Sequence, residues 1–587
     1  MKHTFPLFAV AVLATALVRA EVFPGPDYIE EPDPYASPYA EVGGVLNYAG
    51  TTSPQSLNCF LDNNTFSHMV FGLLYPTLLG SDAVTDELAP GIAKQWEISD
   101  DKQTFTFTLD ERAVWSDGHP VTAKDVKKTF DTIKNPYCSN PYLVILSEIS
   151  CPEILDEKTA GNEARVLRFQ ASEIHWQNIY KIGANIYIMP YRLIEAEEAK
   201  VKASKDAERF NEESQKEAAA TADMYAQIQA SAKNLREKGA LPEETLKKID
   251  DFVATIKYNA RELSVFTTFL KNLKEQDVLA SLNEQLATYS VSTKKFNDRI
   301  IWDASRLYEL KINAAAFKNL CFEFPIVGGP YRLEKHDPGK EIVLKRRADW
   351  WVFNTISGKG VYNFDTINIR FFLSHDNALE AFKKGEVDMI AIYSARQWEK
   401  ETTGDKFYKN WIVKQKISNL SAVGFQGVVM NMRKYPYNDL RVRKALAHLF
   451  DTRRMVNDLM YNAYDIYGSY FEDLYDDPEY AHLRPKHIEF DIDEAYRLLT
   501  EAGFKINHET GKMMMPNGEP FVIDMLINQK SSETFLAVYK NALLRLGIEM
   551  KITLVDFGAW MNKTGNLDFE VTNCAFSGSI LRDPEPM

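Results

Sequence analysis

The sequence has little cysteine for its length, and none of it is arranged for metal binding. Five cysteines are spread over 587 residues, and no two form a Cys-x-x-Cys pair, so neither a zinc site nor a thioredoxin-type redox site is predicted. Cys138 and Cys151 are close enough in the sequence either to pair in an oxidising compartment or to remain two separately buried thiols. The ten histidines are scattered without ligand spacing. No metal site and no cofactor are therefore predicted.

Catalytic motifs are also missing. The sequence has no His-Glu-x-x-His, no Gly-x-Ser-x-Gly and no phosphate-cradling Gly-x-x-x-x-Gly-Lys. The carboxylates Glu472, Asp473, Asp476 and Asp477 cluster in a loop, which is typical of solvated charge. We therefore expect a protein that is not an enzyme. An exported hydrolase of peptides or glycans is the alternative, since a sequence cannot show the facing carboxylates that glycoside hydrolysis needs.

Long apolar runs are absent after the N-terminus. Residues 5–18 are mostly apolar but too short to span a bilayer comfortably. They follow a short basic start and precede small residues ending at Ala20, a pattern that predicts a signal peptide over residues 1–20, cleaved before Glu21. No cysteine follows closely, which argues against a lipid anchor. The mature chain is expected to be exported and soluble.

Positive charge is in deficit, with a formal net charge of −14 and a pI of about 5.4. This balance argues against nucleic acid, and against an anionic membrane surface, as the main partner. The apolar fraction of 45% and charged fraction of 26% are ordinary for a globular protein. The aromatic fraction of 12% fits either an aromatic core or an aromatic-lined ligand cleft.

Two stretches have strong local patterns. In residues 88–130, Phe105, Phe107 and Leu109 alternate with threonines and predict a half-buried strand. Thr122 then caps a helix whose first turn contains Asp125. In residues 427–471, an apolar strand is followed by a turn at 434–439 and an amphipathic helix. A second helical stretch is predicted from Met455 to Tyr464.

These stretches resemble known proteins. Residues 88–130 resemble the signature of the family 5 extracellular solute-binding proteins, which include binders of oligopeptides, dipeptides and nickel, and 431–446 resemble a segment of the peptide binders among them. Residues 362–365 and 468–471 are most similar to the branch for oligopeptides and microcin C. In the family the stretch around Trp115 and Asp117 is structural.

The resemblance implies an α/β, two-lobe periplasmic-binding-protein fold of the class II, or cluster C, type. It places an extended tail at 21–43, lobe one with an accessory subdomain at 44–193 and again at 313–366, and lobe two at 367–587. Because the family continues for roughly another hundred residues, lobe two is expected to be incomplete at Met587, as in a truncated chain.

Residues 194–312 interrupt the family pattern with a highly charged helical segment. One helix is expected to end near Gly239. The next has an apolar heptad from Leu246 to Leu270, typical of a coiled coil, and a third follows. We expect a helical hairpin or three-helix bundle. It is either a self-packed surface bundle or an arm that docks a protein partner.

The resemblance also implies a function and a ligand site. A periplasmic receptor of this family would trap an oligopeptide or peptide-like compound by hinge closure and deliver it to an ABC permease in the inner membrane. The alternatives are the hydrolase and a non-transport scaffold that uses the helical insertion. The ligand contacts expected from the resemblance are Thr51, Thr52, Asn58, Phe425, Gln426, Phe576 and Ser577. The aspartate with which peptide binders hold the ligand's α-amino group is not evident near Phe576 and Ser577.

Overall fold

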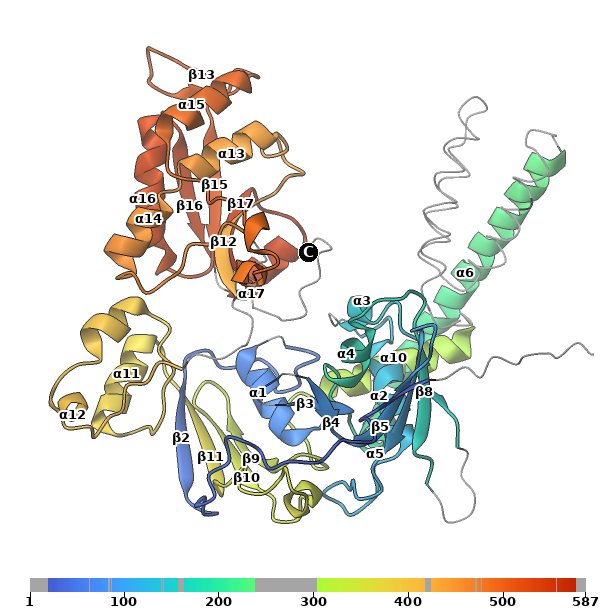
Figure 1. Ribbon diagram of the computed structural model, residues 1–587. Helices are drawn as coiled ribbons and strands as arrows, with labels where there is room; N and C mark the ends of the chain where they lie inside the picture. The colour runs from blue at the N-terminus through green and yellow to red at the C-terminus, as the bar shows by residue number, and fades with distance from the viewer. Residues whose placement is uncertain are drawn as a thin grey trace, which may run out of the picture. The chain divides into compact units, whose positions relative to one another are not determined.

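The computed structural model divides the chain into two compact units, residues 1–390 and 391–587. Figure 1 shows the helices and strands of each. The structure describes residues 20–62, 64–82, 85, 87–138, 140, 142–156, 163–237, 247, 303–417, 424–469, 472–476, 478–555 and 557–576. Within these residues, no helix combines the length and the apolar character needed to cross a membrane. The predicted signal peptide lies outside them, apart from Ala20.

The first unit contains a five-stranded antiparallel sheet. Its strand order is β1-β5-β6-β8-β7. The strands are β1 Glu21–Phe23, β5 Ala93–Ile98, β6 Thr104–Leu109, β8 Val166–Gln170 and β7 Glu153–Ile154. In β6, Phe105, Phe107 and Leu109 are buried as their alternation with threonine predicted.

A second sheet of four strands has the order β2-β11-β10-β9. Its strands are β2 Val45–Gly50, β11 Thr366–Phe371, β10 Glu341–Arg346 and β9 Tyr331–Asp337. β9 and β10 form a hairpin, and β10 pairs antiparallel with β11. β11 and β2 run parallel, so their carboxyl ends meet at one edge of the sheet. A short antiparallel pair, β3 Leu79–Ser81 and β4 Leu88–Pro90, completes the strands in the described part of this unit.

The helices of the first unit outside the insertion are α1 Thr65–Leu74, α2 Ala123–Ile133, α3 Tyr142–Ile145, α4 Asn178–Gly183, α11 His375–Lys384 and the 3-10 helix η1 Trp351–Asn354. One hydrophobic core joins both sheets of the first unit to α1, α2 and α4, whereas α11 packs in a separate small cluster. Trp115 is fully buried in the core, and Asp117 makes an ion pair with Arg192 at 2.8 Å. Both residues therefore have the structural surroundings that the family pattern implied.

The capping of α2 is as the sequence predicted. The buried carboxylate of Asp125 accepts hydrogen bonds from the backbone N–H and the hydroxyl of Thr122, at 2.8 and 3.0 Å. Its other oxygen accepts from the backbone N–H of Tyr191 at 2.8 Å. Asp125 thus connects the start of α2 to the start of α5, Tyr191–Lys202. Of the two alternatives for Cys138, the structure has a buried thiol, and burial raises its pKa to about 12.

The predicted tail at 21–43 packs along the first unit. β1 pairs with β5, the carboxylate of Glu30 accepts from the hydroxyl and N–H of Ser357, and the N–H of Gly43 donates to the carbonyl of Asn363 at 2.9 Å. These contacts connect the segment to the five-stranded sheet at one end and to the loop before β11 at the other.

The helices at both ends of the insertion extend beyond its predicted bounds and pack into the core of the first unit. Its described helices are α5 Tyr191–Lys202, α6 Asp206–Glu237 and α10 Ala304–Asn319. α10 passes through residue 312, and its Phe317, like Ile194 of α5, belongs to the core of the first unit. Polar contacts join the first and last of these helices to α2. The carboxylate of Glu198 in α5 accepts hydrogen bonds from Lys128 of α2 and from Asn313 of α10, both at 2.7 Å. The predicted heptad helix and the third helix lie outside the described residues.

The start of the second unit differs from the prediction. Lobe two was expected to begin at residue 367, but residues 367–371 form β11 between β2 and β10, and α11 packs its Ala378 against Ala49 of β2. The boundary between the units falls after Ile390. The local sequence pattern predicts a strand here, but it does not show which strands pair with it. One of those partners, β2, is more than 300 residues away in the sequence.

The second unit has a mixed four-stranded sheet of order β12-β17-β15-β16. Its strands are β12 Phe425–Met430, β17 Val571–Phe576, β15 Val522–Ile527 and β16 Glu549–Leu554. β15 is parallel to β16 and β17, and β12 is antiparallel to β17. β15 and β16 are therefore joined by a β-α-β crossover that contains α16 Ser532–Arg545.

Helices cover both faces of this sheet. The apolar sides of α13 Leu440–His448, α15 Ile492–Glu501 and α16 share one core with Ile523 and Met525 of β15. On the other face, the indole N–H of Trp560, in α17 Phe557–Gly565, donates to the hydroxyl of Thr572 at 2.8 Å. Short elements complete the described part: the π-helices η2 Gln397–Glu401 and η3 Met455–Leu459, helices α12 Asp405–Tyr408 and α14 Thr452–Arg454, 3-10 helices η4 Glu472–Asp476 and η5 Ala481–Leu483, and strands β13 Lys505–Ile506 and β14 Met513–Met514.

The predicted second helical stretch is shorter than expected. It forms α14 and η3 and ends at Leu459, and Tyr461 and Asn462 have positive φ angles of 52° and 58°. The helical spacing of the apolar residues continued past this point, but the left-handed backbone ends the helix.

Candidate functional site

In the four-stranded sheet of the first unit, the carboxyl ends of β2 and β11 lie at the same edge. The segment after β2 begins at this edge. The N–H of Phe372 donates to the carbonyl of Gly50 at 2.8 Å, and the N–H of Gly339, in the β9–β10 turn, donates to the hydroxyl of Ser53 at 3.1 Å. Ligands of open α/β sheets commonly bind outside the carboxyl ends of parallel strands. This edge is therefore the candidate ligand surface of the first unit.

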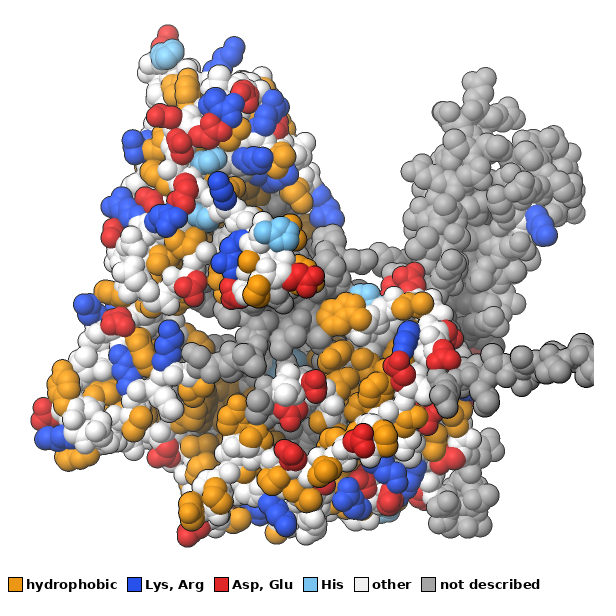
Figure 2. Space-filling view, in the orientation of Figure 1, with side chains coloured by type: hydrophobic (Ala, Val, Ile, Leu, Met, Phe, Trp, Pro, Cys, Tyr) orange, Lys and Arg blue, Asp and Glu red, His pale blue; other side chains and the backbone are white. Residues whose placement is uncertain are grey.

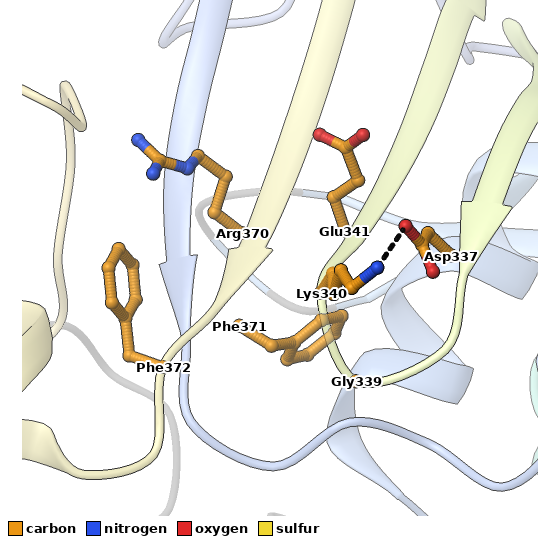
Figure 3. Close-up of a pocket in the computed structure, with 7 residues that line it drawn as sticks. All are labelled: Asp337, Gly339, Lys340, Glu341, Arg370, Phe371 and Phe372. Atoms are coloured by element: carbon orange, nitrogen blue, oxygen red, sulfur yellow. Dashed lines mark hydrogen bonds and ion pairs between the residues drawn. The ribbon is translucent and has the colours of Figure 1, made fainter.

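A shallow pocket of about 350 Å³ lies at this edge (Figure 3). It is lined by Asp337, Gly339, Lys340, Glu341, Arg370, Phe371 and Phe372. The lining residues come from the β9–β10 turn and from the end of β11, as the close-up shows. Backbone, aromatic and charged groups therefore border one shallow opening.

The charges around the pocket are balanced. Lys340 pairs with Asp337 at 3.2 Å, and Glu341 pairs with Lys335 at 2.6 Å. The guanidinium of Arg370 donates to the backbone carbonyl of Glu386 at 2.9 Å and lies 5.5 Å from the ring centre of Phe372. Because each pocket charge already has a protein partner, the arrangement favours hydrogen bonding to a ligand over capture of a free ion.

Aromatic rings support the pocket from the core side. The ring of Phe371 meets that of Phe66 edge to face with centroids 5.2 Å apart, and Phe66 in turn contacts Tyr48 at 6.2 Å. Gly50 lies beneath these rings, since a Cβ there would come within 2.8 Å of Phe371 and 2.9 Å of Phe66. The close packing requires glycine at the end of β2.

The structure separates the three predicted contacts of the first unit. Thr51 is half-buried and Thr52 is exposed, and both lie in the segment that adjoins the pocket. Asn58 is fully buried instead. Its amide donates to the carbonyl of Leu320 at 3.0 Å and its side-chain oxygen accepts from the N–H of Phe60 at 3.1 Å. The prediction that Asn58 contacts ligand is therefore corrected, because these bonds hold two chain segments together.

In the second unit the structure brings three of the predicted residues together. Phe425 of β12 lies opposite Phe576 of β17, and Gln426 lies opposite Ala575. β12 is at the edge of the sheet, and the side chain of Gln426 is exposed. Ser577 lies outside the described residues. Two arginines after β12 make structural contacts: Arg441 donates to Asp439 and to the carbonyl of Glu501, and Arg443 donates to the carbonyl of Tyr437 at 2.7 Å.

Sequence reasoning missed the pocket residues of the β9–β10 turn. The run Asp337-Pro338-Gly339-Lys340 marked a hairpin turn, and Gly339 has a positive φ of 74°. Nothing in that pattern showed that the turn lies against the segment after β2. Within the described part of the chain, no group of three or more His, Cys, Asp and Glu side chains is arranged to hold a metal ion.

Comparison with known proteins agrees with this architecture. The model of the bacterial extracellular solute-binding proteins, family 5 Middle, matches residues 87–587. Protein YejA of Escherichia coli strain K12 is 29% identical over 276 residues, which is 42% of this chain and 46% of that protein. A probable peptide-binding protein YejA of Agrobacterium fabrum is 28% identical over 285 residues, 42% of this chain and 45% of its own. The chain spans about half the length of the curated relatives it matches.

Solved structures share the fold. The oligopeptide-binding protein AppA of Bacillus subtilis, in complex with a nonapeptide, superposes with a TM-score of 0.58 at 15% identity, covering 93% of this chain and 81% of that one. At this identity the likeness shows the fold, which is the predicted α/β fold of the periplasmic binding proteins. With a family model that matches most of its length, the chain belongs to family 5 of the bacterial extracellular solute-binding proteins.

Proposed function

We propose that this chain is a periplasmic receptor that binds oligopeptides or peptide-like compounds and delivers them to an ABC import permease of the inner membrane. The observation that carries the proposal is the family match over residues 87–587. The name of the Agrobacterium relative and the nonapeptide held by AppA favour peptides within the family's range of ligands.

The geometry suits an extended peptide. β12 is an edge strand, and its outer backbone N–H and C=O groups are of the kind that pair with an extended chain. Main-chain hydrogen bonds do not depend on the ligand's sequence. An open pocket with balanced charges, like that at the end of β11, would accept side chains of several kinds. Together these features support broad selectivity.

Each unit carries its own candidate contacts, so each can be tested separately. Thr51 and Thr52 beside the pocket are proposed for the first unit, and Phe425, Gln426, Phe576 and Ser577 for the second. The family's peptide binders hold the ligand's α-amino group with an aspartate near this position, where this chain has Phe576 and Ser577. Recognition of a free α-amino group would therefore need a different carboxylate or would be weak.

The direct test is to titrate the purified mature chain with tri- to nonapeptides and to measure the heat of binding by calorimetry. The Tm of the protein is measured with and without peptide, and the peptide is examined afterwards by mass spectrometry. The receptor predicts saturable binding, a raised Tm and an intact peptide. Peptide fragments in the mixture would instead establish the hydrolase, and the absence of heat and of any Tm shift across the panel would reject the peptide assignment.

The partner and compartment need their own experiment. Fractionation of cells that express the full chain should recover it in the periplasm with Glu21 as the first residue. Crosslinking there should capture a permease subunit only when peptide is present. Recovery in the cytoplasm with residues 1–20 attached would reject export. A role for the helical insertion in docking another protein would appear as crosslinks from α6.

A further inference from the structure

Residues 405–417 expose an unusual set of apolar side chains. This segment, which we term the lysine–tryptophan segment, begins with α12 and continues without regular structure. Four large apolar side chains in it are mostly exposed: Tyr408 77%, Trp411 72%, Val413 72% and Ile417 76%. Soluble proteins rarely leave such residues clustered in water, and clusters of this kind mark interaction surfaces.

The charge of the segment is opposite to that of the whole chain. It contains four lysines and one aspartate, whereas the chain has a net charge of −14. Lys406, Lys409, Lys414 and Lys416 are all exposed. Figure 2 shows lysine or arginine and hydrophobic side chains side by side in the region of α12. A partner for this surface must be both apolar and anionic.

The backbone holds the segment in a defined turn. The carbonyl of Lys406 accepts from the N–H groups of Trp411 and Ile412, at 2.9 and 3.1 Å. Asn410 between them has a positive φ of 55°, which is uncommon outside glycine. The exposed indole of Trp411 is therefore presented by a hydrogen-bonded turn.

Two of the four lysines lie over aromatic rings. The ammonium of Lys409 is 5.2 Å from the ring centre of Trp411, and that of Lys414 is 4.2 Å from the ring centre of Trp398. In this position the cation covers a ring face that a sugar ring would otherwise stack on. Exposed Val413 and Ile417 likewise have no use in binding a glycan. These two facts favour a lipid surface over a polysaccharide.

We propose that the lysine–tryptophan segment docks on a membrane surface that contains acidic phospholipid. Tryptophan and tyrosine prefer the boundary between headgroups and acyl chains, valine and isoleucine enter it, and lysines extend their ammonium groups to lipid phosphates. The contact is a property of this segment, and it does not require that the ligand be a peptide. Its effect would be to hold a receptor near the membrane.

The test is co-sedimentation of the mature full chain with phosphatidylcholine vesicles, either pure or containing about a third phosphatidylglycerol. The anionic vesicles should bind the chain at least about tenfold more tightly, and binding should weaken as salt rises. The combined variant Lys409→Glu, Lys414→Glu and Lys416→Glu should lose this preference. The matched control is Lys505→Glu, Lys512→Glu and Lys551→Glu, three exposed lysines elsewhere in the same unit, which should retain it.

A second measurement does not depend on how the charge variants fold. Brominated lipid in the anionic vesicles should quench tryptophan fluorescence of the wild-type chain, and Trp411→Phe should remove a clear part of that quenching. Equal binding to neutral and anionic vesicles, or equal binding of the two triple variants, would overturn the proposal. So would a dimer that Trp411→Phe dissociates, because the face would then be an interface between copies of the chain.

Discussion

The rings of Phe66 and Phe371 meet edge to face with centroids 5.2 Å apart, and both lie where a Cβ at residue 50 would come within 3 Å of them. Phe66 comes from α1 and Phe371 from the end of β11, so this contact joins a helix to the strand that ends at the pocket. Phe371, which lines the pocket, can hold this position only because residue 50, at the end of β2, is glycine.

Gly50→Ala is expected to destabilise the protein by about 1–3 kcal/mol, because the new Cβ would force both rings to move from a packed core. Since Phe371 lines the pocket, weaker peptide binding should accompany the lower Tm. Thermal unfolding and calorimetry measure the two effects. The control is Gly25→Ala in the same unit, where a Cβ meets nothing within 4 Å and φ is not positive. Its effect should stay within about 0.5 kcal/mol, and equal effects at the two glycines would contradict the packing argument.

Asn58→Ala tests whether that residue is structural. Removing the amide leaves the buried carbonyl of Leu320 and N–H of Phe60 without these hydrogen bonds, which should cost about 1–3 kcal/mol of unfolding free energy. Peptide affinity measured well below the variant's Tm should equal that of the wild type. A large loss of affinity in a chain that is still folded would restore Asn58 to the ligand site.

Asp125 should give the protein a distinctive pH dependence. Burial raises the pKa of its carboxyl above the ordinary value of 3.8, against the opposing hydrogen bonds from Tyr191 and Thr122. Between the ordinary and the raised value, the folded chain holds a proton that the unfolded chain releases. The stability contributed by this group therefore falls as pH rises through that interval.

Asp125→Asn cannot titrate, and its NH2 group cannot accept the hydrogen bonds, so the variant should be less stable by about 1–3 kcal/mol. The difference in unfolding free energy between wild type and variant should shrink as pH rises from below 3.8 toward neutrality. Urea unfolding at a series of pH values measures it. Asp131→Asn, in the same helix at a more exposed position, is the control. A difference that grows with pH would mean that the hydrogen bonds outweigh burial.

Thr52→Ala and Gln426→Ala test the two ligand surfaces. Each removes one exposed polar side chain, and loss of one hydrogen bond to ligand should weaken peptide binding by about 1 kcal/mol, roughly fivefold. Neither should change the Tm of the free protein appreciably. Thr553→Ala, exposed on the far edge strand β16, is the matched control. Unchanged affinity in both variants would remove these surfaces from the proposed site.

Much of the local structure could be predicted from the sequence. The alternation at Phe105, Phe107 and Leu109 and the capping pair Thr122 and Asp125 both appear where expected. The family was evident from residues 88–130 and is confirmed by the match over 87–587. These features depend on contacts between residues that are close in the sequence, so the local pattern of side chains is enough to predict them.

Only the tertiary structure decided which segments lie together. It placed β11 beside β2, buried Asn58 against Leu320, and brought the turn at Gly339 beside the end of β11, where the two line the pocket. Each relationship joins segments that are far apart in the chain, and its energy comes from sheet pairing and core packing that no local pattern encodes. The sequence by itself determined the elements and the family, whereas long-range packing determined which polar residues are left to meet a ligand.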